Sequence, residues 1–132
     1  MGFKEKKHTA DWALLVWGKD IASLFTEAAR GMYALMSPRL ELSPHQTRVF
    51  STHETDNESR LVAFLNELIF YLEQEKLVFD SFDLKMSAEG LDVSMQGSRF
   101  TSMEKLIKAV TFHNLEIIET PQGYQVEIVF DV

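Results

Sequence analysis

The chain has 132 residues, of which 45% are hydrophobic, and a formal net charge of −7 at pH 7. This length and composition predict one globular domain over residues 1–132 and exclude a disordered chain. There is no cysteine, so any metal ion must take oxygen or imidazole ligands. The acidic charge disfavours direct binding of nucleic acid and favours a basic protein partner.

Cellular location is predicted from apolar runs and the N-terminus. No run approaches the roughly 20 consecutive apolar residues that a membrane-spanning helix needs. The first residues are basic, through Lys4, Lys6 and Lys7, but they lead into no apolar stretch of the signal-peptide kind. We therefore expect a cytoplasmic protein that does not contact a membrane.

The first predicted elements are a strand and a helix. Residues 12–18 form a short run of apolar, β-forming residues, which predicts a buried strand. Asp20 is the expected N-cap of a helix in which apolar residues recur every three or four positions up to Met36. Pro38 ends this helix, because proline disfavours helical geometry in the residue before it.

A second strand and a second helix follow. Residues 49–50 mark the short strand. Thr55 and Glu58, three residues apart, predict a capping box at the start of the helix. Its apolar stripe ends near Lys76.

The remainder of the chain is predicted to be β-structure. Residues 78–86 and 91–95 alternate apolar and polar side chains on either side of a tight turn, which predicts a β-hairpin. Residues 106–119 are rich in β-forming residues, and residues 120–123 form a second hairpin turn. The last strand alternates strictly up to Val132, so one face is core and the other is mostly solvated.

The predicted element order is β-α-β-α-β-β-β-β. Helices and sheets bury their apolar faces against one another, so this order predicts a layered fold. We expect an α/β (α+β) domain with two helices packed on one face of a mixed, largely antiparallel β-sheet.

Catalytic signatures are absent from the sequence. It contains no glycine-rich phosphate loop, no G-x-S-x-G nucleophile elbow and no H-E-x-x-H zinc motif. The four histidines are scattered along the chain. We therefore expect a protein that is not an enzyme.

Two carboxyl groups stand next to each other at the end of the chain, the side chain of Asp131 and the α-carboxylate of Val132. Like charges this close repel, and a divalent cation relieves the repulsion. Asp11, just before the first predicted strand, adds a third oxygen donor if that strand is adjacent. Such a set suits Ca²⁺, Mg²⁺ or Mn²⁺ better than zinc. The alternatives are a turn aspartate at Asp11 and an ordinary solvated terminus, and both are common features.

Five short strings occur in order along nearly the whole chain: His8-Thr9-Ala10-Asp11, Ala28-Ala29-Arg30-Gly31-Met32, Leu65-Asn66-Glu67-Leu68-Ile69-Phe70, Lys108-Ala109-Val110-Thr111-Phe112-His113 and Phe130-Asp131-Val132. Together these strings resemble the archease family. The resemblance implies a small cytosolic protein that assists the RNA-splicing ligase RtcB, which uses GTP and manganese to form a guanylylated histidine and then joins RNA ends. It also implies that the chain promotes the guanylylation step and multiple turnover, in tRNA splicing and RNA repair.

The family's metal site maps onto Asp11, Asp131 and Val132, the same set that charge and strand geometry indicate. Two departures from the family pattern lie next to it. Lys7 replaces a residue that is usually acidic, which would weaken metal affinity or change the partner surface. Trp12 is bulkier than the residue usual after the aspartate. Neither departure removes a proposed ligand.

Lys108, Glu67 and His8 are further candidates for contact with the partner. Lys108 would meet a phosphate or an acidic group of the ligase, or else is a solvated surface lysine. Glu67 lies near the apolar stripe of its helix, where a partly buried carboxylate needs a partner, whether functional or purely structural. His8 has the alternative role of a surface histidine that bonds to backbone.

Two competing functions remain at the level of sequence. One is a general chaperone or modulator of nucleic-acid-modifying enzymes, in which the metal is purely structural. The other is a metal-dependent phosphoesterase. One metal with three protein ligands and no nearby general base disfavours the phosphoesterase.

Overall fold

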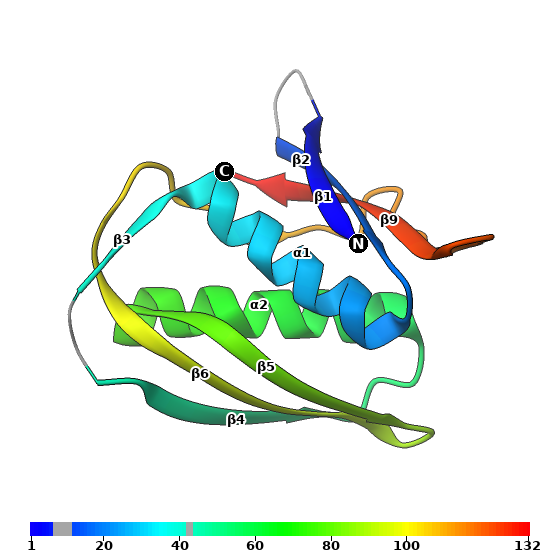
Figure 1. Cartoon of the computed structure of the whole chain (residues 1–132), viewed down its shortest axis with the longest axis horizontal. Helices are drawn as coiled ribbons and strands as arrows, with labels where there is room; N and C mark the ends of the chain where they lie inside the picture. Colours follow the sequence, from blue (N-terminus) through cyan, green and yellow to red (C-terminus); the bar gives the residue numbers. More distant parts are fainter. Residues whose placement is uncertain (7–11, 42–43) are drawn as a thin grey trace.

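The computed structural model describes residues 1–6, 12–41 and 44–132 (Figure 1). Within these ranges the elements in chain order are β1 (Gly2–Lys6), β2 (Trp12–Gly18), α1 (Ile21–Met36), β3 (Pro38–Leu40), β4 (Gln46–Thr52), α2 (Asn57–Glu75), β5 (Leu77–Ser87), β6 (Gly90–Met103), β7 (Ala109–Val110), β8 (Ile118–Thr120) and β9 (Gly123–Asp131). No helix in the described part of the chain is long and apolar enough to cross a membrane.

The described strands form two sheets, and every pairing between them is antiparallel. In the first sheet β2 lies between β1 and β9, and the other edge of β9 pairs with β7 and β8. In the second sheet the long strand β6 is central. It pairs with β5 on one edge and with β4 and β3 on the other.

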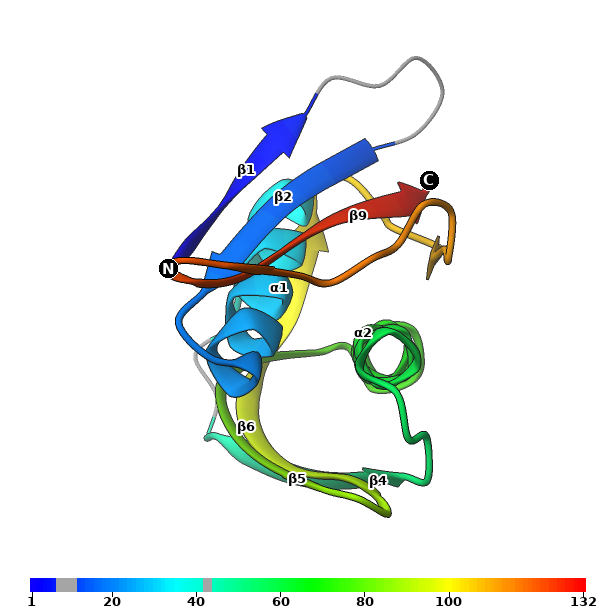
Figure 2. The same cartoon turned by 90° about the vertical axis from the view of Figure 1, so that its right-hand side faces the viewer.

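The two helices lie between the two sheets, which gives three layers (Figure 2). α1 packs mainly on β1 and β2 of the first sheet, whereas α2 packs on β5 of the second sheet and on β7. One hydrophobic cluster joins all three layers, and it includes Phe25, Phe64 and Phe130, which are fully buried. Each sheet therefore turns one face to the helices and the other to solvent.

α1 forms where the sequence predicts it. The carboxylate of Asp20 accepts a hydrogen bond from the backbone N–H of Ser23 at 2.7 Å, which caps the first turn. The helix ends at Met36, and Ser37 adopts a left-handed conformation before Pro38. The predicted cap and the predicted stop are both confirmed.

The predicted capping box of α2 is wrong. The N-cap is Asp56, whose carboxylate accepts from the backbone N–H of Ser59 at 2.9 Å. Glu58 does not bond back to Thr55, because its Oε2 accepts a hydrogen bond from the backbone N–H of Ile117 at 3.0 Å. A tertiary contact thus replaces the local one that the spacing predicts.

The fold class is confirmed, with two helices and largely antiparallel β-structure. The structure adds β1 and β3, which local pattern did not indicate, and divides the strands between two sheets. Residues 106–119, predicted as β-rich, contribute to strands only at β7 and at the start of β8. β1 and β3 carry few buried side chains, so they lack the apolar alternation that marks a strand.

Candidate functional site

The start of β2 lies beside the end of β9. Trp12, the first residue of β2, pairs with Phe130, and Asp131 follows as the last residue of β9. Figure 1 marks this end of β9 with the letter C. Asp11, His8 and Lys7 lie outside the described residues, so the roles proposed for them stay predictions.

Asp131 is exposed at the end of β9. Its Cα partner on β7 is Ala109, which offers only a methyl side chain. Its backbone oxygen accepts a hydrogen bond from Lys108 N at 2.8 Å, which fixes the main chain. Among the described residues none donates a hydrogen bond or forms an ion pair with its carboxylate. Val132 beside it is 41% exposed.

Residues 104–117 form the segment that frames this end of β9. The backbone N–H of Glu104 bonds to Met36 O at 3.0 Å, and the N–H of Thr111 bonds to Val129 O at 3.1 Å. Ile107 is fully buried and pins the segment to the core. The segment is therefore held on one side by the end of α1 and by β9.

The other side of the segment is held by α2. Asn66 Oδ1 accepts from the backbone N–H of Val110, and Glu58 Oε2 accepts from that of Ile117, each at 3.0 Å. Sequence reasoning did not assign these contacts. The one signal for Asn66 is a polar side chain in a helix whose neighbouring residues, Leu65 and Leu68, are apolar.

Two lysines of the segment lie close to the site. Lys105 places its ammonium 4.2 Å from the ring centroid of Trp12, a cation–π contact across the base of β2. Lys108 is exposed, between buried Ile107 and partly buried Ala109. Among the described residues Lys108 has no ion-pair partner.

Glu67 lies on α2 and is partly buried, as the sequence predicted. Burial raises the pKa of its carboxyl group, since the charged form loses hydration. No hydrogen bond or ion pair joins it to another described residue. Its negative charge, after burial, contributes to the raised pKa of Tyr71. Within the described residues, Glu67 and Asp131 belong to no group of three or more side chains that could hold a metal ion.

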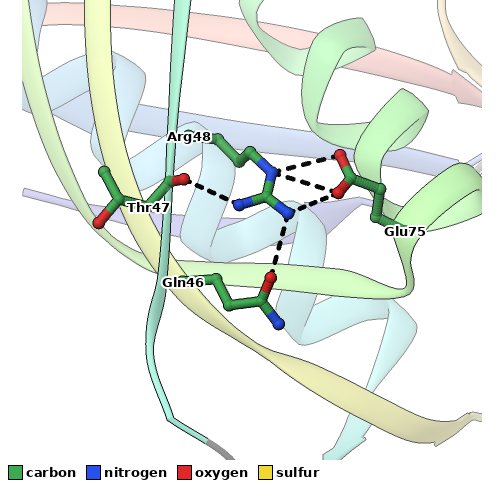
Figure 3. Close-up of polar contacts among 4 residues, drawn as sticks. All are labelled: Gln46, Thr47, Arg48 and Glu75. Atoms are coloured by element: carbon green, nitrogen blue, oxygen red, sulfur yellow. Dashed lines mark hydrogen bonds and ion pairs between the residues drawn. The ribbon is translucent and has the colours of Figure 1, made fainter.

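A separate polar cluster joins β4 to the end of α2 (Figure 3). Arg48 Nη2 lies 2.5 Å from Glu75 Oε1, and Arg48 Nε lies 3.2 Å from the same oxygen. The guanidinium also donates to Gln46 Oε1 and to Thr47 O. The hydrogen bonds from Arg48 lower the pKa of Glu75. This cluster fixes the edge strand β4 to the C-terminal end of α2.

No group of three or more histidine, aspartate or glutamate side chains gathers as a metal cluster within residues 1–6, 12–41 and 44–132. The described part of the proposed metal site consists of Asp131 and Val132. A three-ligand set therefore depends on Asp11.

The model of the Archease protein family (MTH1598/TM1083) matches residues 3–132. This chain belongs to the archease family. It is 28% identical to protein archease of Aeropyrum pernix, covering 99% of the chain and 97% of that protein. It is 29% identical to protein archease of Methanosarcina barkeri, covering 95% of the chain and 92% of the relative.

Two solved structures share the archease fold with this chain. The solution structure of protein 1598 of Methanobacterium thermoautotrophicum matches with a TM-score of 0.74 and 24% identity, and 99% of each chain is covered. The crystal structure of an archease from Thermotoga maritima, described as a possible chaperone, matches with a TM-score of 0.72 and 22% identity, over 98% of this chain and 96% of that one. At these identities the likeness concerns the fold.

Proposed function

We propose that this archease-family chain is a metal-binding protein cofactor, without enzymatic activity of its own, for the RNA-splicing ligase RtcB. In this role it promotes guanylylation of the ligase and multiple turnover during tRNA splicing and RNA repair. One observation carries the proposal. Trp12 pairs with Phe130, so the two ends of the chain that bear the proposed ligands are joined through neighbouring strands.

The residues at this end of the first sheet fit a hard divalent cation. Asp11 directly precedes Trp12 in the sequence and Asp131 directly follows Phe130, and we propose that both aspartates contribute to one site. The carboxylate of Asp131 is exposed beside the small Ala109, with no described donor on it. Asp11, Asp131 and the carboxylate of Val132 are oxygen donors, which suit Ca²⁺, or else Mg²⁺ or Mn²⁺.

A bound cation would neutralise the carboxylates and cross-link β2 to β9. The chain itself supplies a fixed surface, since the segment 104–117 is bonded to both β9 and α2. From that segment Lys108 extends into solvent next to Asp131. We propose that this surface docks at the ligase and holds its reacting groups in guanylylation geometry, which is a positioning effect.

A guanylylation assay tests this function. RtcB is incubated with GTP and Mn²⁺, with or without the chain, and the amount of guanylylated ligase is measured. We expect stimulation by the wild type, and none by Asp11→Ala or Asp131→Ala, which should also lose Ca²⁺ binding while keeping their circular dichroism spectra. Glu73→Ala, which removes an exposed carboxylate on α2, outside the segment 104–117, is the matched control. Undiminished stimulation by either aspartate variant would contradict the proposal.

The second candidate is a general chaperone or modulator of nucleic-acid-modifying enzymes, in which the metal serves only folding. The description of the Thermotoga maritima protein as a possible chaperone favours it. The discriminating measurement titrates RtcB and several unrelated enzymes with metal-loaded and metal-free chain. A chaperone protects many enzymes from aggregation, whereas the proposed cofactor acts on the ligase alone and requires its metal.

A further inference from the structure

Glu27 is one of two charged residues that the described part of the chain buries, and it is 7% exposed. The other, Arg60, donates hydrogen bonds to the carbonyl oxygens of Glu54 and Ser87 and is thereby satisfied. A buried carboxylate likewise needs donors, because it has lost its hydration. The carboxylate of Glu27 therefore needs groups that donate hydrogen bonds to it.

The only described partner of Glu27 is Arg30. Its Nη1 lies 3.4 Å from Glu27 Oε1, which is long compared with the roughly 2.7–2.9 Å of a charge-assisted hydrogen bond. The Arg30 side chain is 62% exposed, so solvent screens this contact. No described residue donates to the second oxygen, Oε2. The carboxylate is thus buried with most of its acceptor capacity unused.

Glu27 lines a groove of about 350 Å³ between α1 and β5. Ser23 and Thr26 line it from the helix, and Phe82 and Leu84 line it from the strand. Figure 2 shows the first half of α1 next to the second sheet. Met1 and Ala22 also line it, so the groove combines one buried carboxylate with hydroxyl groups and apolar side chains.

This lining fits a lysine or arginine side chain. Such a side chain carries an apolar stem, which would pack on Phe82 and Leu84, and a cationic head, which would bind Glu27. The hydroxyl of Thr26 donates to Ala22 O at 3.0 Å, so its oxygen remains an acceptor for that head. An anionic ligand is disfavoured by Glu27 and by Asp83 at the rim.

The strand beside the groove has an edge that no described strand covers. β5 runs over 11 residues and pairs with β6 on one edge. On the other edge the hydroxyl of Tyr33 on α1 accepts a hydrogen bond from the backbone N–H of Phe79, and the strand beyond its three buried first residues is left for a partner. An extended peptide can add to such an edge through main-chain hydrogen bonds, while a neighbouring pocket takes one of its side chains. A net charge of −7 favours a basic segment.

We propose that the groove between α1 and β5 is a docking site for an extended, basic segment of a partner protein, with Glu27 as the residue that receives an arginine or lysine side chain. Arg30 occupies the mouth of the groove in the absence of that segment and is displaced by it. The site shares no residue with the proposed metal centre, so binding of the segment requires no metal.

Binding of a model peptide to the full chain tests the site. The probe is a blocked heptapeptide, Thr-Val-Thr-Arg-Thr-Val-Thr, and the matched peptide carries glutamine at its centre. We expect the arginine peptide, at up to 1 mM, to shift the backbone amide resonances of Ser23, Thr26, Phe82 and Leu84. The glutamine peptide should bind at least tenfold more weakly. Equal binding of the two peptides, or no shift with the arginine peptide, would overturn the proposal.

Three variants assign the contact to Glu27. Glu27→Gln keeps the side-chain shape and should weaken the arginine peptide at least tenfold. Glu73→Gln, an exposed glutamate on α2, removes the same charge and should leave binding unchanged. Arg30→Gln opens the groove and should bind the peptide several-fold more tightly, a readout that remains if Glu27→Gln fails to fold. Unchanged affinity for the arginine peptide in Glu27→Gln, or unchanged or weaker affinity in Arg30→Gln, would overturn the proposal. Free butylammonium has the cationic head and apolar stem but no peptide backbone. If it bound as tightly as the peptide, an extended segment would not be the ligand.

Discussion

Asn66 on α2 accepts a hydrogen bond from the backbone N–H of Val110 at 3.0 Å, and this contact holds β7 in place. Val110 is 5% exposed, so water does not readily replace the acceptor. On its other side β7 pairs with the last residues of β9. The helix therefore supports the strand that lies next to Asp131.

Replacing Asn66 by leucine should destabilise the chain by about 1–3 kcal/mol, because a buried amide then lacks its acceptor. The measurement is urea denaturation, together with hydrogen exchange of the Val110 amide, which should become faster. Asn66→Asp retains an acceptor oxygen, so its free energy of unfolding should fall less than that of Asn66→Leu. Equal stability of Asn66→Leu and wild type would show that the contact contributes nothing.

Arg60 joins the start of α2 to the segment before this helix and to the end of β5. Its Nε donates to Glu54 O at 2.8 Å, and its Nη2 donates to Ser87 O. Hydrogen bonds from a charged donor are worth about 1.5–3 kcal/mol each, so Arg60→Met should cost at least about 2 kcal/mol in thermal or urea unfolding. Arg39→Met, at an exposed position, should stay within about 0.5 kcal/mol of wild type. If both variants lose the same stability, the buried contacts of Arg60 are not the cause.

Metal binding at the end of β9 should appear as a gain in stability. A ligand that binds only the folded chain stabilises it by about 2.7 kcal/mol at a hundredfold excess over its dissociation constant. We expect Ca²⁺ to raise the melting temperature of the wild type and of Glu73→Ala, and to leave that of Asp131→Ala unchanged. A chelator should reverse the gain. An equal rise in Asp131→Ala would exclude this carboxylate as a ligand.

The partly buried carboxyl group of Glu67 should make the stability of the chain depend on pH. Burial raises its pKa in the folded chain above the ordinary 4.5, so the folded state holds the proton more tightly than the unfolded state. Its contribution to stability therefore falls as pH rises from about 4.5 through the folded pKa. Glu67→Gln should melt at a higher temperature than wild type at pH 7, with the difference shrinking at pH 3–4. Glu73→Gln is the exposed control, and the same pH profile in both variants would refute a role for burial.

Much of the fold follows from local sequence. The three- and four-residue spacing in α1, with Asp20 before it and Pro38 after it, determines the helix and both of its ends, because caps and proline act within a few residues. The hairpin between β5 and β6 and the final alternation of β9 are equally local. The strings that resemble the archease family also lie within single elements or short segments, so the order of residues along the chain is enough to recognise them.

Tertiary structure decided the rest, since it depends on contacts between residues far apart in the chain. Glu58 has the spacing of a capping box, yet its carboxylate accepts from Ile117, 59 positions away. Glu27 carries a charged side chain, and only the tertiary packing of α1 buries it. The sequence by itself determined the helices, the hairpins and the carboxylates at both ends of the chain. The division into two sheets and the partners of individual side chains follow from non-local packing, which local periodicity does not encode.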